Sequence, residues 1–272
     1  MAALKNSQMR IVSLAPSASS ILCAIGARKL LVGVTKWCAD VAPVHGLPKL
    51  GDCWHMNSVD EIFALKPTLV IGSVPYKQET VAKLLKHPVN FLAMNPRTLD
   101  DVYADIQLLG GIAGRLRQAE RVVRSMKQGF AVIRRKAKRG KPRLRVYCEA
   151  WPNPRISSPP WVAELVEMAG GEMVVPAGRK VTDEQVTAAQ PDVIILAWAA
   201  TGDKADLEKA YQVETWRDLP AIRKRHVYVM RDELLNTPGP PLAQGADQLY
   251  RLLQRAGKQV HSPQRAQRAQ NR

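Results

Sequence analysis

The sequence of 272 residues predicts an α/β fold of two Rossmann-like lobes, each with a central parallel sheet, bridged by a single long α-helix. Three observations predict it. A segment of the first half recurs in the second half, strand-like and helix-like patterns alternate in both halves, and a long amphipathic stretch lies between them. The predicted boundaries are 10–97 for the N-terminal lobe, 98–141 for a connector with the bridging helix, 142–257 for the C-terminal lobe and 258–272 for a basic disordered tail.

The internal repeat comprises residues 58–71 (SVDEIFALKPTLVI) and 182–195 (TDEQVTAAQPDVII). Each copy reaches a proline, Pro67 or Pro191, that cannot extend a helix. An apolar, β-branched run follows, which is typical of a parallel strand covered on both faces. Each copy also opens with a capping box, in which a hydroxyl and a carboxylate or amide three residues later cap the helix start; the pairs are Ser58 with Glu61 and Thr182 with Gln185.

The first strand of each lobe precedes its copy of the repeat. Residues 10–15 (RIVSLA) form a strand-like run, and a helix to Gly26 follows. Residues 144–150 (LRVYCEA) form the corresponding run, followed by an irregular proline-rich loop and a helix over 161–170. The alternation of strands and helices implies right-handed βαβ units.

The connector is predicted to be helical. Thr98 with Asp101 forms a capping box at its start, and Gly110-Gly111 interrupts the first helix. From about residue 115 to 139, apolar residues recur at steps of three and four. This spacing predicts an amphipathic helix about 35 Å long at 1.5 Å per residue.

The formal charge of +16 is concentrated in two segments. Residues 115–145 hold thirteen Lys or Arg and one acidic residue, and residues 251–272 hold six and none. We interpret these segments as a solvated helix face and a tail. Binding of nucleic acid or another acidic surface is the alternative, but no helix-turn-helix, zinc-finger or RNP signature accompanies the charge. We therefore expect no nucleic-acid partner.

The compartment is predicted from what the sequence contains. No apolar run is long enough for a membrane span, and residues 1–9 lack the apolar core of a secretory signal. The four cysteines show neither CxxC spacing nor the density of a disulfide scaffold, which agrees with a reducing compartment. We expect a monomeric, cytoplasmic protein, or a periplasmic one if a signal segment has been removed.

Candidate ligand-binding residues lie where the predicted strands end. Ligands of open parallel sheets bind beyond the carboxyl ends of the strands, and four of the six tryptophans fall there. Aromatic walls suit a large, flat or apolar ligand, and the amides of a helix start can hold an anionic or carbonyl group. The candidates are Pro16, Ser17, Trp37, Trp54, His55, Tyr76, Trp151 and Trp198.

Metal binding and catalysis are less well supported. Cys38, Cys53, His55 and Cys148 are ligand types that metals accept, but no two have the spacing of a metal site. The motifs GxSxG, GxGxxG, HExxH and the Walker loop are absent. We therefore expect no catalytic residues, no metal site and no required cofactor. An enzyme or metal-cluster protein using these four residues, or His55 as an axial ligand to a macrocycle's metal, is the alternative.

Several segments resemble a known family. Residues 10–17 (RIVSLAPS), 59–71 and 181–194 are similar to periplasmic-binding-protein-like domains of the cobalamin and iron-siderophore group, known as class III. Within that group, the loop 37–40 (WCAD) and Met56-Asn57 most resemble the vitamin B12-binding branch, in its subset without signal peptides. The resemblance extends from about residue 10 to 253.

This resemblance implies a non-catalytic protein that holds a corrinoid (cobalamin or cobinamide) or a related metal chelate in an aromatic cleft between two lobes. Haem and siderophores are the other ligands it leaves open. It implies a carrier, store or sensor, or the substrate-binding component of an ABC transporter. Trp37 and Trp54 match the branch's aromatic contacts, whereas Trp151 and Trp198 match them less well.

The resemblance also implies a way of docking to an ABC permease. In transporter-linked members, an acidic residue on each lobe meets arginines of the permease. Glu79 stands at the first-lobe position, and Glu208 is a looser match for the second.

Overall fold

The computed structural model describes residues 9–56, 58–137 and 143–260. The chain divides into two compact units, residues 1–126 with 238–240 and residues 127–237 with 241–272. The division falls inside a helix of the predicted connector, so the sequence-based domain boundaries stay predictions. The unit that contains residues 1–126 is called the first unit below, and the other the second unit.

The first unit contains a five-stranded sheet in the order β3-β2-β1-β4-β5, and all of its strand pairs are parallel. Its central strands are short apolar runs whose residues are almost all buried. Because all five strands run the same way, their carboxyl ends meet at one edge. The strands are β1 (Ile11–Ser13), β2 (Leu31–Thr35), β3 (Lys49–Leu50), β4 (Leu69–Ser73) and β5 (Phe91–Met94).

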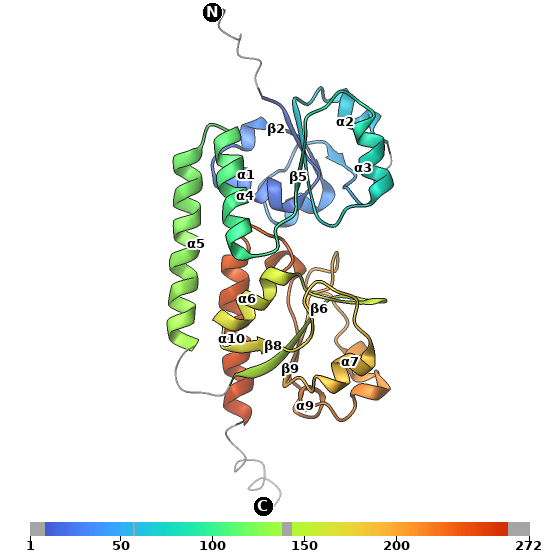
Figure 1. Cartoon of the computed structure of the whole chain (residues 1–272), viewed down its shortest axis with the longest axis vertical. Helices are drawn as coiled ribbons and strands as arrows, with labels where there is room; N and C mark the ends of the chain where they lie inside the picture. Colours follow the sequence, from blue (N-terminus) through green and yellow to red (C-terminus); the bar gives the residue numbers. More distant parts are fainter. Residues whose placement is uncertain (1–8, 57, 138–142, 261–272) are drawn as a thin grey trace, which may run out of the picture. The chain divides into compact units, whose positions relative to one another are not determined.

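Helices cover both faces of this sheet. Figure 1 shows α1 and α4 on one side and α2 and α3 on the other. The predicted capping box of Thr98 and Asp101 starts α4 and is confirmed. The elements are α1 (Pro16–Ala24), η1 (Arg28–Leu30), η2 (Lys36–Asp40), α2 (Asp60–Ala64), α3 (Gln78–Leu85) and α4 (Leu99–Ile112).

The second unit contains a sheet in which β6 pairs with β9 on one side and with both β7 and β8 on the other. Its pairs are parallel except that of β6 with β7. The prediction of an irregular loop after residue 150 was wrong here, because β7 folds back on β6 as an antiparallel hairpin. The strands are β6 (Leu144–Pro152), β7 (Arg155–Ser157), β8 (Gly171–Met173), β9 (Val193–Leu196) and β10 (Val227–Val229).

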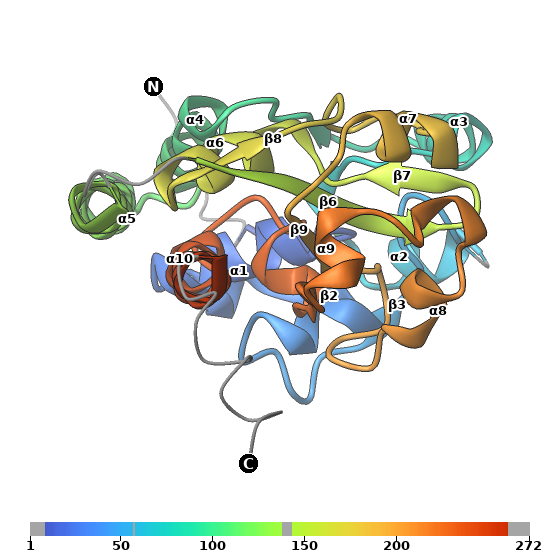
Figure 2. The ribbon, with the colours of Figure 1, turned by 90° about the horizontal axis from the view of Figure 1, so that it is seen from below.

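Two helices of this unit, α6 and α10, pack against each other, and Figure 2 shows the unit's helices from below. The long helix α10 continues to Val260, beyond the predicted start of the tail at residue 258, and residues 261–272 lie outside the described residues. The elements are α6 (Pro160–Met168), α7 (Asp183–Ala188), α8 (Glu208–Tyr211), η3 (Glu214–Trp216), α9 (Pro220–Arg223), η4 (Asp232–Leu234) and α10 (Leu242–Val260).

The internal repeat is visible in matching backbone contacts. Lys66 (φ 48°) and Gln190 (φ 40°), 124 positions apart, lie two residues after the ends of α2 and α7, and each has a positive φ immediately before the proline. The guanidinium of Arg10 donates to the carbonyl of Leu65, and that of Arg145 donates to the carbonyl of Ala189. Both arginines thus satisfy carbonyls that a helix end leaves without partners.

The helix starts of the repeat differ. Thr182 and Gln185 form the predicted capping box. Ser58 and Glu61 do not, because α2 begins one residue later than the box requires. The Ser58 hydroxyl instead donates to the carboxylate of Asp60 and accepts from its backbone N–H.

The connector contains two helices, α4 and α5 (Leu116–Ala137). The predicted interruption at Gly110-Gly111 was wrong, since α4 runs through both glycines and the turn lies at Gly114 (φ 64°). A Cβ on Gly110 would lie 2.4 Å from the Cβ of Ala119, so this glycine permits close packing of α4 on α5. The predicted apolar face of α5 comprised Leu116, Ala119, Val123, Met126, Phe130 and Ile133. It is confirmed for the last five, which are buried, and was wrong for Leu116, which is 51 % exposed in the first turn.

Two glycines of α10 should respond oppositely to alanine. A Cβ on Gly245 would lie 1.9 Å from the backbone oxygen of Leu234, whereas the nearest atom to one on Gly257 is 4.0 Å away. Gly245→Ala should therefore lower the free energy of unfolding by about 1–3 kcal/mol through overpacking. Gly257→Ala should raise it by up to about 1 kcal/mol through helix propensity. Urea denaturation followed by circular dichroism measures both, and equal stabilities would contradict the packing of α10 on η4.

Candidate ligand-binding site

The loop after β3 presents Trp54 at the carboxyl edge of the first sheet. The Asp52 carboxylate accepts from the backbone N–H groups of Trp54 (2.9 Å) and His55 (2.6 Å), and the Asp52 N–H donates to the His55 carbonyl. A side chain on Gly51 would collide with that carbonyl. These contacts fix a tight turn that leaves the Trp54 side chain 47 % exposed and His55 exposed beside it.

The neighbouring loops at this edge are joined by hydrogen bonds. Lys77 N–H donates to the carbonyl of Cys53, which ties the loop after β4 to the loop after β3. The half-buried Tyr76 donates its hydroxyl to the carbonyl of Met94, at the end of β5 (2.9 Å). Burial raises the pKa of Tyr76, so the phenol remains a donor at neutral pH. The structure therefore brings Trp54, His55 and Tyr76 to one connected group of loops.

Three further candidates lie at the same edge. Trp37, in η2 after β2, is half-buried, and the ammonium of Lys36 lies 4.4 Å from its ring centroid. Pro16 and Ser17 open α1 after β1. Ser17 does not cap this helix; its side chain is 2 % exposed, and its hydroxyl has no partner among the described residues.

The carboxyl edge of the second sheet presents Trp151. It lies on β6 opposite Ile156 of β7, and its indole N–H donates to the carbonyl of Asn153 (2.9 Å), inside the hairpin turn. The side chain is 42 % exposed. The hairpin therefore holds a large aromatic surface toward solvent.

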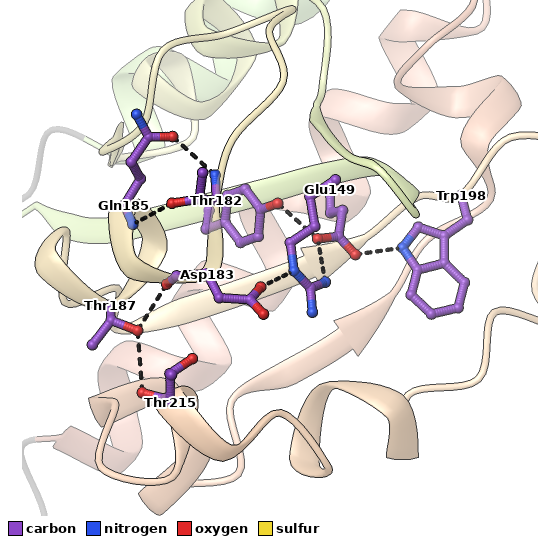
Figure 3. Close-up of polar contacts among 9 residues, drawn as sticks. Glu149, Thr182, Asp183, Gln185, Thr187, Trp198 and Thr215 are labelled. Carbon is purple, nitrogen blue, oxygen red and sulfur yellow. Dashed lines mark hydrogen bonds and ion pairs between the residues drawn. The ribbon is translucent and has the colours of Figure 1, made fainter.

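The second candidate of this unit, Trp198, is in a different environment. It follows β9 and is only 4 % exposed. Its indole N–H donates to Oε1 of Glu149 (2.8 Å), as Figure 3 shows. Trp198 is thus part of the core of the second unit, with little surface left to contact a ligand.

Glu149 is the centre of a buried polar network that sequence reasoning missed. Its carboxylate is fully buried on β6, and Oε2 accepts from the Tyr147 hydroxyl (2.7 Å) and from the Arg155 guanidinium (2.9 Å). Burial and the neighbouring Glu149 raise the pKa of Tyr147, which keeps the phenol protonated as a donor. Both oxygens of the buried carboxylate are therefore satisfied.

Arg155 extends this network across the hairpin. Besides Glu149, its guanidinium pairs with Asp183 at the start of α7 and lies 4.2 Å from the ring centroid of Trp216. Burial opposes the positive charge of Arg155, but the two carboxylates together raise its pKa above the ordinary value. The ion pairs and the stacked ring connect Arg155 of β7 to β6, to the start of α7 and to η3. They therefore stabilise the β6–β7 hairpin that carries Trp151.

The predicted docking residues lie at helix starts. Glu79 is in the first turn of α3 in the first unit, and Glu208 begins α8 in the second unit. Both are exposed, as contact with another protein requires.

The cysteine and histidine set does not form a metal site. Among the residues that the structure describes, no group of three or more His, Cys, Asp or Glu side chains is arranged to hold a metal ion. Cys38, Cys53 and Cys148 are buried. Burial, aided at Cys53 by the Asp52 carboxylate, raises the pKa of Cys53 and that of Cys148 to about 12. These thiols are protonated at neutral pH and are poor ligands and nucleophiles.

No helix in the described part of the chain is long and apolar enough to cross a membrane.

Curated relatives match most of this chain. It is 26 % identical over 259 residues to the uncharacterized ABC transporter substrate-binding lipoprotein YvrC of Bacillus subtilis, covering 90 % of this chain and 80 % of that protein. It is 24 % identical over 249 residues to a vitamin B12-binding protein of Pectobacterium carotovorum, covering 88 % and 86 %.

Solved structures share the fold. The apo form of the periplasmic heme-binding protein RhuT from Roseiflexus matches with a TM-score of 0.78 and 24 % identity, covering 92 % of this chain and 99 % of that one. The periplasmic vitamin B12-binding protein BtuF of Vibrio cholerae matches with a TM-score of 0.71 and 23 % identity, covering 92 % and 98 %. A family model described as periplasmic binding protein matches residues 11–234. The chain therefore belongs to the periplasmic binding protein family and has the α/β fold and the solute-binding role of that family.

Proposed function

We propose that this protein binds a corrinoid, cobalamin or cobinamide, on exposed aromatic side chains and performs no chemistry on it. One observation carries the proposal. Of the six tryptophans, all within the described residues, only Trp54 and Trp151 are exposed, and each lies at the carboxyl edge of its own sheet. An exposed tryptophan leaves a large apolar surface in contact with water, so this placement favours a ligand that covers an exposed indole.

The chemistry of the two edges agrees with a large, flat ligand. The first-sheet edge offers Trp54, Tyr76 and half-buried Trp37, and the second offers Trp151. Exposed His55 is next to Trp54, where an imidazole can coordinate the metal of a bound chelate. The names of the relatives include both vitamin B12 and heme, and heme is the competing ligand for the same surface.

The transport role is part of the same proposal. The protein would present Glu79 and Glu208, both exposed, to basic residues of an ABC permease. Delivery to an importer from outside requires a periplasmic location. Fractionation of cells that express the natural gene tests this location: a periplasmic protein supports the transporter role, and a cytoplasmic one leaves a carrier, store or sensor.

The ligand is tested by titration of the purified protein with aquo-cobalamin, cobinamide and, separately, haem. Saturable quenching of tryptophan fluorescence by a corrinoid at micromolar concentration or below is expected, because the ligand would cover exposed indoles. A shift of the visible band of aquo-cobalamin that His55→Ala abolishes would identify His55 as an axial ligand. Saturable quenching by haem with none by either corrinoid would overturn the corrinoid assignment.

A further inference from the structure

The outer face of α5 carries a row of exposed arginines. Arg117, Arg121, Arg124 and Arg135 recur at steps that place them on one side of the helix, and all are exposed. The buried residues of α5 lie on the opposite side, since a helix of 3.6 residues per turn separates the two sets by about half a turn. At 1.5 Å per residue, the row from Arg117 to Arg135 extends over about 27 Å.

Little on the helix neutralises this row. The described part of α5 contains seven Lys or Arg and one acidic residue, Glu120. None of the ion pairs found among the described residues involves Arg117, Arg121 or Arg124. Like charges this close destabilise a helix slightly, so their presence favours a partner of opposite charge.

The shape and composition of the face indicate which partner. It has no aromatic side chain on which a nucleobase could stack, because the only aromatic residue of α5, Phe130, is buried. Its exposed large apolar side chains are Leu116 and Val132, too few for insertion into a bilayer. A straight row of guanidinium groups without an apolar face suits adsorption to a plane of phosphate groups.

We propose that the arginine row of α5 binds the headgroups of anionic phospholipids and holds the protein at a membrane surface. This inference rests on the proposed function in one respect: the ABC permease that the protein would serve lies in a membrane. The attraction is electrostatic and long-ranged, and it concentrates the protein where a permease is found.

Co-sedimentation with vesicles tests the proposal. The wild-type protein should bind vesicles of phosphatidylcholine mixed with phosphatidylglycerol and should not bind phosphatidylcholine alone. The triple variant Arg117→Glu, Arg121→Glu, Arg124→Glu should lower the partition coefficient by a factor on the order of 100. Raising the salt toward 1 M should release the wild type, because the Debye length falls to about 3 Å.

A matched control distinguishes the effect of the arginine row from the effect of the protein's net charge. The variant Lys29→Glu, Lys83→Glu, Lys86→Glu changes exposed residues by the same total charge and should keep most of the binding. Equal loss in both variants, or no binding of the wild type to anionic vesicles, would overturn the proposal. So would tighter binding of the wild type to double-stranded DNA than to these vesicles, lost in the α5 variant.

The corrinoid titration of the α5 variant distinguishes the two proposals. Its circular dichroism and ligand affinity should equal those of the wild type, since the changed residues are exposed and belong to neither sheet edge. A protein that binds vesicles but no corrinoid would refute only the proposed ligand, and one that binds a corrinoid but no vesicles would refute only the membrane surface.

Discussion

Replacement of Glu149 by alanine should lower the free energy of unfolding by about 3–5 kcal/mol, because removing one partner leaves the others buried and unpaired. Three donors on separate parts of the second unit depend on this carboxylate: the Tyr147 hydroxyl, the Trp198 indole and the Arg155 guanidinium. After the substitution, Asp183 would be the one ion-pair partner left to Arg155 among the described residues. The loss should be greatest around the β6–β7 hairpin.

Urea denaturation followed by circular dichroism measures this effect. Glu172→Ala is the matched control, because Glu172 is an exposed glutamate on β8 of the same sheet, and its loss should change stability by no more than about 0.5 kcal/mol. Glu149→Ala combined with Trp198→Phe should cost less than the sum of the single variants, because both remove the same hydrogen bond. Equal stability of Glu149→Ala and Glu172→Ala would show that the network contributes nothing to folding.

The fold could be predicted in outline because its local signals agree with its tertiary structure. The repeat around Pro67 and Pro191 predicted helix ends, and the structure adds the reason, a left-handed residue before each proline and an arginine that caps the preceding carbonyls. The predictions of local structure failed where a tertiary contact outweighs the local preference of the residue. Gly110 was interpreted as a helix interruption because glycine is a poor helix former, but its role is to admit Ala119 of the next helix.

For the candidate site, the sequence could predict which loops lie at the ends of the strands, but not which of their side chains are exposed. Loops at the carboxyl ends of parallel strands follow from topology, so Trp54 and Trp151 were identified as candidates. The burial of Trp198 could not be foreseen, because its partner Glu149 is 49 residues away in the sequence. A glutamate inside an apolar strand, Val146-Tyr147-Cys148-Glu149, was the one signal available, since an ionised side chain there requires partners.

The two exposed tryptophans provide the sharpest test of how the ligand is held. Trp54→Ala and Trp151→Ala should each weaken corrinoid binding by about 1–3 kcal/mol, or about 5- to 150-fold in Kd, if each ring stacks on the ligand. Titration followed by the visible spectrum measures Kd without relying on the tryptophans. Leu85→Ala is the control, because Leu85 is exposed at the far end of α3, away from the carboxyl edge, and its loss should leave Kd unchanged.

The double variant separates two arrangements. If the ligand stacks on both rings, each single variant should weaken binding, and the double variant should weaken it further than either single variant. If Trp151→Ala leaves Kd unchanged while Trp54→Ala weakens it, the ligand is held by the first unit alone, and the Glu149 network serves only the stability of the second. If neither changes Kd, the exposed rings mark contacts with another protein, and the corrinoid site lies elsewhere.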